Sequence, residues 1–266
     1  MTINSNLQNF ELIRIDSILN QLLVYLKDNF GLNNSLLGFY KLGSLTHGGY
    51  NSYYSDIDVA IIAHKEIDPI FIESAKKELI KWDNDMGIKV SLFWTDRSFS
   101  SGRFPVLDQI DFLDNRELIF EKERILPKRP SVDMIRNYLL SHPIEYWTEK
   151  SNYFSKLRVW NELEAKELLR CLLYPARFIY TYSKGLMTSN DEAVSFLRKL
   201  HDNNFLKYSF QDFRQCQLSL ELIEEALTVR NLRRSAQSLF IKHQSKLIEQ
   251  HQSILNWIQY EKQKHS

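Results

Sequence analysis

The chain has little cysteine: Cys171 and Cys216 are the two cysteines among its 266 residues. Both lie in segments with a helical pattern, which favours buried thiols in a reducing compartment over a disulfide framework. The sequence lacks Cys and His at metal-site spacing, and it lacks an apolar run of about 18 residues. Its first residues do not place a basic region before an apolar core. We therefore expect a cytoplasmic protein without a signal peptide or a membrane partner.

An excess of charge of one sign is also absent. The formal net charge is +1, with 25% charged and 44% hydrophobic residues. So small a net charge creates no field that would recruit a polyanion, which disfavours nucleic acid as a partner and favours a small molecule. The hydrophobic fraction and the length fit a globular protein with a sizeable core and one large or two small domains.

Glycine is nearly missing from the second half, where Gly185 is the single glycine after residue 131. The segment 127–130, Pro-Lys-Arg-Pro, resembles a linker in front of this half. We therefore predict a first domain at residues 1–128 and an all-helical second domain at residues 129–266. Its candidate helices cover residues 132–140, 145–160, 162–184, 189–200, 212–228 and 232–260.

The first half alternates helical and extended patterns, which predicts an α+β fold with a mixed sheet and flanking helices. A first helix carries apolar residues at helical spacing from Ile15 to Leu26 and is expected to end near Gly31. The other expected elements are strands at 36–42, 59–62 and 88–95, a helix from Pro69 to about Gly87, and an edge strand at 119–126.

A glycine turn and two acids form the most informative motif. Asp56 and Asp58 are separated by Ile57, so in an extended strand both carboxylates point to the same face. Without further context, this pattern would indicate two solvent-exposed carboxylates at a turn or a strand edge. The following run Val59-Ala60-Ile61-Ile62 is apolar enough for a buried strand, and acids at its start repel each other unless a cation lies between them.

Gly43 and Ser44 end the preceding strand. Glycine lets the backbone approach a ligand closely, and Ser44 with nearby N–H groups can donate to phosphate oxygens. The spacing of Gly-Ser, eleven residues, and then Asp-apolar-Asp-apolar resembles the signature of the polymerase-beta-like nucleotidyltransferase superfamily. The resemblance implies that Asp56 and Asp58 hold Mg²⁺ and act in catalysis, and that Gly43, Ser44 and Ser55 cradle the triphosphate of ATP.

A second stretch, at residues 168–193, is similar to the helical domain of the streptomycin and spectinomycin adenylyltransferases, the aminoglycoside (3'')(9) group. It shows a helix rich in tyrosine and arginine, a turn at Gly185, and a helix start at Ser-Asn-Asp-Glu-Ala. The similarity implies antibiotic resistance by transfer of AMP from ATP to a hydroxyl of a small molecule, with Asp191 and Glu192 as acceptor-binding residues. A purely structural interpretation is also open, because Ser189 and Glu192 stand at capping-box spacing.

One position departs from the superfamily pattern. The third carboxylate is expected on the next strand, and aligning residues 88–92 with that strand places Lys89 at its position. Either Asp96, Asp108 or Asp111 supplies the acid from a shifted position, or two carboxylates suffice, or the site binds nucleotide without turnover. Lys89 paired with Asp56 or Asp58 would replace the metal. The alternative function is therefore a nucleotide-binding regulatory protein or pseudoenzyme, and transfer to protein or RNA stays open because residues 230–234 are locally basic.

Overall fold

The computed structural model describes residues 2–29, 36–157, 162–202, 213–231, 244–247 and 256. The chain divides into two compact units, Met1–Pro130 and Ser131–Ser266. Most of the helix expected at 232–260 lies outside the described residues. Within the described part, no helix is both long and apolar enough to cross a membrane.

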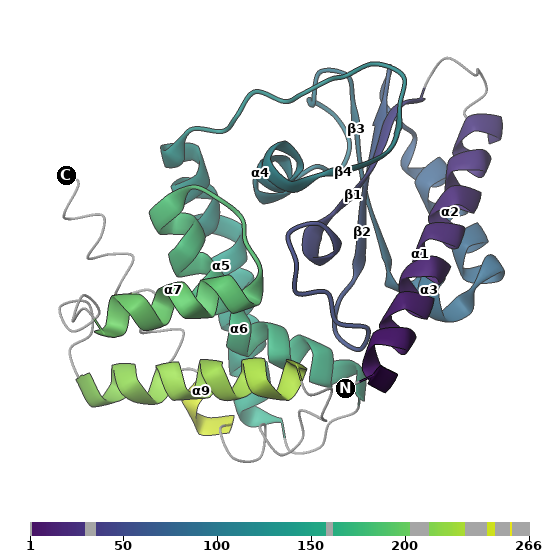
Figure 1. Ribbon diagram of the computed structural model, residues 1–266. Coiled ribbons are helices and arrows are strands. Elements are labelled where there is room, and N and C mark those ends of the chain that lie inside the picture. Colours follow the sequence, from purple (N-terminus) through teal and green to yellow (C-terminus); the bar gives the residue numbers. More distant parts are fainter. Residues whose placement is uncertain are drawn as a thin grey trace. The chain divides into compact units, whose positions relative to one another are not determined.

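A four-stranded mixed sheet forms the centre of the first unit (Figure 1). Its strands are β1 (Leu36–Leu42), β2 (Ile57–Ala63), β3 (Val90–Asp96) and β4 (Glu117–Glu121), in the order β3-β2-β1-β4. The central strand β1 is antiparallel to β2 and β4, whereas β2 and β3 are parallel. This confirms the predicted α+β class and the mixed sheet.

Helices cover both faces of the sheet (Figure 1). On one face lie α1 (Thr2–Asn29), α2 (Pro69–Trp82) and α3 (Asn84–Lys89), and on the other lies α4 (Val106–Asn115). The side chains of β2 alternate between two cores, as a strand buried on both faces requires. Val59 and Ile61 join the core with α1 and α2, while Ala60 and Ile62 join the core with Phe112 of α4.

The predicted bounds of three elements in this unit are wrong. The helix from Pro69 ends at Trp82, and Asp83 starts a new helix because its side chain accepts a hydrogen bond from Met86 N at 3.1 Å. Gly87 therefore lies inside α3, and β3 begins at Val90. Ile88, expected to face the core, is 60% exposed. The edge strand β4 also begins and ends earlier than expected, since its pairing with β1 runs from Glu117 opposite Lys41 to Glu121 opposite Gly38.

Every secondary-structure element described in the second unit is helical. Its elements are α5 (Val132–Lys156), α6 (Glu162–Lys184), α7 (Asn190–Asp202), α9 (Phe213–Asn231) and a short 3₁₀ turn at Gln244–Lys246. The break expected between residues 140 and 145 is wrong, because α5 continues through Pro143. A proline removes one N–H donor from a helix, and the packing of α5 along α6 outweighs that loss. Cys171 is a buried free thiol in α6 whose pKa burial raises to about 12.

Candidate active site

Asp56 and Asp58 lie at the start of β2. Asp56 directly precedes the strand, and Asp58 stands opposite Leu42 of β1 and Ser91 of β3. Because β2 has a neighbour on each side, both acids are only partly exposed. Ile57 and Val59 point into the core under α1 and α2, so Asp58 points to the opposite face of the sheet, the face of α4.

Gly43 packs directly against Asp58. It follows β1 with a φ of +69°, and a Cβ placed on it would lie 2.3 Å from Asp58 Oδ2. Any side chain at this position would therefore collide with the carboxylate as well as adopt a conformation that L-residues disfavour. The turn is closed because Thr46 N and His47 N donate to Gly43 O at 3.0 and 3.1 Å. Gly43 is thus required where it stands because of Asp58, and its role toward a nucleotide stays a prediction.

Ser44 belongs to the 3₁₀ turn Gly43–Leu45 and is partly exposed. Its hydroxyl has no hydrogen-bond partner among the residues described. Ser55 differs, because its buried hydroxyl accepts from Asn51 N at 2.9 Å and its own N–H donates to Asn51 O at 2.8 Å. These bonds close the turn that leads into Asp56. The geometry leaves Ser44 available to a ligand and gives Ser55 a structural task.

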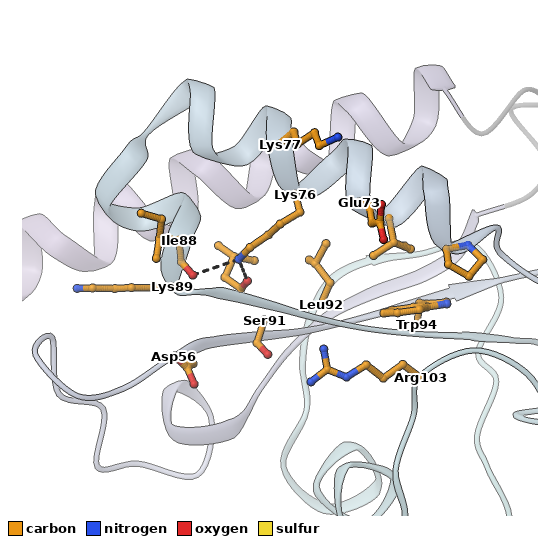
Figure 2. A pocket seen from close by; sticks show the side chains of 13 residues that line it. Asp56, Glu73, Lys76, Lys77, Ile88, Lys89, Ser91, Leu92, Trp94 and Arg103 are labelled. Atoms are coloured by element: carbon orange, nitrogen blue, oxygen red, sulfur yellow. Dashed lines mark hydrogen bonds between the residues drawn. The ribbon is translucent and has the colours of Figure 1, made fainter. Parts of the chain in front are cut away.

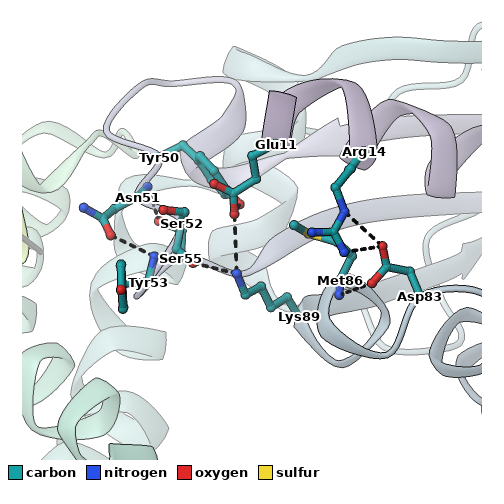
Figure 3. A network of polar contacts seen from close by, with 10 residues as sticks. All are labelled: Glu11, Arg14, Tyr50, Asn51, Ser52, Tyr53, Ser55, Asp83, Met86 and Lys89. Carbon is teal, nitrogen blue, oxygen red and sulfur yellow. Dashed lines mark hydrogen bonds and ion pairs between the residues drawn. The ribbon is translucent and has the colours of Figure 1, made fainter. Parts of the chain in front are cut away.

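Lys89 is the last residue of α3 and not a strand residue, which corrects the alignment made from sequence. Its Nζ donates to Ser52 O at 2.6 Å and forms an ion pair with Glu11 of α1 at 3.5 Å (Figure 3). Tyr50 OH also donates to Glu11, at 3.3 Å. The ammonium therefore connects α1 and α3 to the loop before Asp56. On β3, the residue opposite Asp58 is Ser91.

The three acids considered as a third carboxylate have different positions. Asp96 lies opposite Ala63 at the far end of β3 and binds the Ser98 and Ser100 hydroxyls. Asp108 lies in the first turn of α4. Asp111, one turn further along α4, is buried, and its Oδ2 accepts from Gly43 N at 2.7 Å. Asp111 therefore contacts the glycine turn, and it does so as an acceptor for the backbone.

The carboxylate pair fits one mode of magnesium binding. Among the described residues, no group of three or more His, Cys, Asp and Glu side chains is placed to hold a metal ion. Mg²⁺ is commonly bound by one or two carboxylates, with phosphate oxygens and water completing its octahedron. Asp56 and Asp58 supply that number of hard oxygen ligands, so the donor set fits a metal that arrives with a phosphate ligand.

A cavity of about 580 Å³ extends from Asp56 along the outer edge of β3 (Figure 2). Its volume lies in the range of small-molecule sites. Cationic side chains outnumber the anionic ones in its lining, which consists of Asp56, Pro69, Ile72, Glu73, Lys76, Lys77, Ile88, Lys89, Val90, Ser91, Leu92, Trp94 and Arg103. Sequence reasoning missed Arg103, because an isolated arginine in a loop belongs to no motif.

The predicted acceptor-binding acids lie in the first turn of α7. Ser189 Oγ accepts from Glu192 N at 3.2 Å, so the capping interaction is present. The Glu192 carboxylate accepts from the Thr188 hydroxyl and, at 3.5 Å, from Tyr180 OH. Asp191 is half exposed and lies 3.9 Å from the buried guanidinium of Arg230. Burial lowers the pKa of Arg230. Arg230 is therefore buried, and residues 232–234 of the basic segment lie outside the described residues.

No family model and no curated protein matches the sequence. Among solved structures, the fold is similar to the crystal structure of spectinomycin adenyltransferase AAD(9) from Enterococcus faecialis with ATP and spectinomycin. The TM-score is 0.50 and the sequence identity 14%, and the match covers 87% of this chain and 98% of that chain. This similarity shows a nucleotidyltransferase-like fold with a helical part.

Proposed function

We propose that the protein is a Mg²⁺-dependent nucleotidyltransferase that moves AMP from ATP to a hydroxyl of a small molecule of the aminoglycoside class. The observation that carries the proposal is the packing of Asp58 on Gly43, with Asp56 beside it and the Ser44 hydroxyl at the same turn. The fold of an ATP-bound spectinomycin adenyltransferase supports it. The weak net charge favours a small acceptor over a polyanion.

Each residue then has a defined task. Asp56 and Asp58 would hold Mg²⁺, which when bound offsets phosphate charge and orients the α-phosphate for attack. Ser44 donates its hydroxyl to a phosphate oxygen, and Gly43 keeps the backbone close to Asp58. In the transfer, the acceptor hydroxyl oxygen bonds to the α-phosphorus and its proton passes to water, while the bond from the α-phosphorus to the oxygen that bridges the α- and β-phosphates breaks and pyrophosphate leaves. Asp191 and Glu192 supply negative charge suited to the ammonium groups of the acceptor.

The deciding experiment incubates the protein with Mg²⁺, ATP labelled at the α-phosphate, and a panel that includes spectinomycin and streptomycin. We expect labelled product from the wild type and none from Asp58→Asn or Asp56→Asn. Asp85→Asn is the matched control, because Asp85 is exposed on α3 and away from β2. Tight ATP binding with no product on any acceptor would favour the nucleotide-binding pseudoenzyme. The specific indication for it is that Ser91, not a carboxylate, stands opposite Asp58 on β3.

A further inference from the structure

Arg103 lies on the strand edge beside the candidate site. After β3 the chain turns back, and Arg103 pairs with Trp94 through two backbone hydrogen bonds, of 3.1 and 2.9 Å. Gly102 makes this approach possible, since its φ is +88° and a Cβ there would lie 2.3 Å from Trp94 O. The backbone of Arg103 is therefore fixed against β3, although its side chain is exposed.

The guanidinium is directed to the face that carries the acids. Its Cζ lies 5.3 Å from the centre of the Phe93 ring. Phe93 is two residues beyond Ser91 on the same face of β3, a step of about 7 Å, and Ser91 stands opposite Asp58. Figure 2 shows the guanidinium extending along the strand toward Ser91 and Asp56, which line the same cavity. Stacking on the ring leaves the edge N–H donors of the guanidinium open to a ligand.

The charges of the cavity distinguish Arg103 from the lysines. Lys76 Nζ donates to Gly87 O and Ile88 O at 2.8 and 3.2 Å, and Lys89 pairs with Glu11. Lys77 and Lys76 come from α2, on the opposite side of β3 from Asp56 and Arg103 (Figure 2). Among the described residues, no carboxylate lies within ion-pair distance of the Arg103 guanidinium. A planar cation thus lines the same cavity as Asp56, without an ion-pair partner of its own in the described part of the chain.

We infer that Arg103 binds the phosphate chain of the nucleotide. It would add a residue to the nucleotide site formed by the Gly-Ser and Asp-x-Asp motif. The inference rests on the proposed nucleotidyl transfer. A nucleoside triphosphate with one bound Mg²⁺ still carries net negative charge, and here it would lie beside two aspartates. A further cation would reduce the repulsion between the phosphates and these aspartates that the metal does not cancel. Arginine offers a planar pair of N–H donors that matches two phosphate oxygens, which a lysine does not.

The test measures the dissociation constants of ATP, ADP and AMP with Mg²⁺ by titration calorimetry on the full chain. Arg103→Gln is expected to weaken ATP binding about tenfold to a hundredfold, as for loss of a charged hydrogen bond, and to weaken AMP binding less. Arg103→Lys should lie between Gln and the wild type. Arg97→Gln is the matched control, since Arg97 is an exposed arginine of the same loop that pairs with Glu123, and its ATP affinity should stay within about twofold of the wild type.

The outcomes separate the two proposals. If the wild type binds ATP and Arg103→Gln binds ATP with the same affinity, the role of Arg103 is overturned and the proposed function still stands. An equal loss of affinity for ATP and for AMP in Arg103→Gln also overturns the role of Arg103. The arginine would then not contact the β- or γ-phosphate, which AMP lacks. Absence of ATP binding by the wild type overturns both. A thermal melt of each variant verifies folding. Because Arg103 is exposed, its substitution should not disturb the fold.

Discussion

At the scale of single residues, the contact between Gly43 and Asp58 is the most sensitive point of the candidate site. Gly43→Ala would place a methyl group 2.3 Å from Asp58 Oδ2 and displace that carboxylate. Because a displacement of about 1 Å can cost about a hundredfold in rate, we expect a loss of that order in kcat for AMP transfer. The measurement is the steady-state rate with saturating ATP and acceptor.

Gly48→Ala is the matched control for this substitution. Gly48 has a φ of +88°, in the same loop, and a Cβ there would have nothing within 4 Å. Both variants should lose about 1 kcal/mol of stability from backbone strain, but Gly48→Ala should keep its rate. Equal rates in the two variants would show that the Asp58 contact does not matter for turnover.

Lys89 provides a second test, because sequence and structure predict opposite results for Lys89→Glu. If Lys89 occupied the position of a lost metal ligand, a glutamate there would restore an acid and raise the rate of transfer. The structure instead has Lys89 paired with Glu11, whose side chain is 14% exposed, and bound to Ser52 O. A glutamate would repel Glu11 and release the loop before Asp56.

We therefore expect Lys89→Glu to lose about 2 kcal/mol of unfolding free energy and to lower the rate. Urea denaturation and the transfer assay measure the two effects. Lys89→Arg, which keeps a cation for Glu11, should retain most of the stability. A faster Lys89→Glu enzyme would refute the structural role assigned to Lys89.

At the scale of elements, the loop that follows β3 depends on the ionisation of Asp96. Burial raises the pKa of Asp96, but hydrogen bonds from Ser100 N and from the Ser98 and Ser100 hydroxyls outweigh it and lower the pKa to about 2. The ordinary value is 3.8, so the folded state binds the proton more weakly than the unfolded state does. The resulting stability is complete above about pH 5 and is lost as the pH falls toward 2.

Asp96→Asn removes this dependence. We expect the variant to be less stable than the wild type by about 1–2 kcal/mol at pH 6, allowing for solvent screening, with the difference shrinking toward zero near pH 2. Urea unfolding at a series of pH values measures it. A difference that is independent of pH would mean that the charge of Asp96 does not hold the loop.

The same elements show where sequence patterns were sufficient and where they were not. The strand that follows Asp56 and contains Asp58 was predicted because its signal is local: an apolar run with acids at its start. The pattern Ile88-Lys89-Val90 alternates like a strand, but the Asp83 cap and its bond from Arg14 at 2.6 Å begin a helix there instead. Pro143 reads as a helix end, yet packing against α6 carries α5 through it. Tertiary contacts decided both cases.

At the scale of the whole molecule, the candidate site divides into local and assembled parts. Gly43, Ser44, Asp56 and Asp58 belong to one short segment, and the resemblance of their spacing to a family signature predicted that they share a site. Asp111 contacts the glycine turn through the docking of α4, and Arg103 lines the cavity beside Asp56 through the return of the chain along β3. Such neighbours depend on register and on loop path, which a single sequence does not specify.

The division of the chain at Pro130 leads to a final prediction, that residues 1–130 fold alone. Both cores of this unit are built from its own strands and helices, and Arg129 near its end pairs with Asp114 of α4. A unit of this size buries enough surface for cooperative folding.

We expect the fragment to unfold in one transition and its melting temperature to rise with ATP and Mg²⁺, because binding to the folded state stabilises it. It should transfer no AMP to an acceptor, since Asp191 and Glu192 are missing. The same fragment carrying Asp58→Asn should melt cooperatively without the ATP-dependent rise, whereas a broad, non-cooperative melt of the parent fragment would show that this unit needs the helical one to fold.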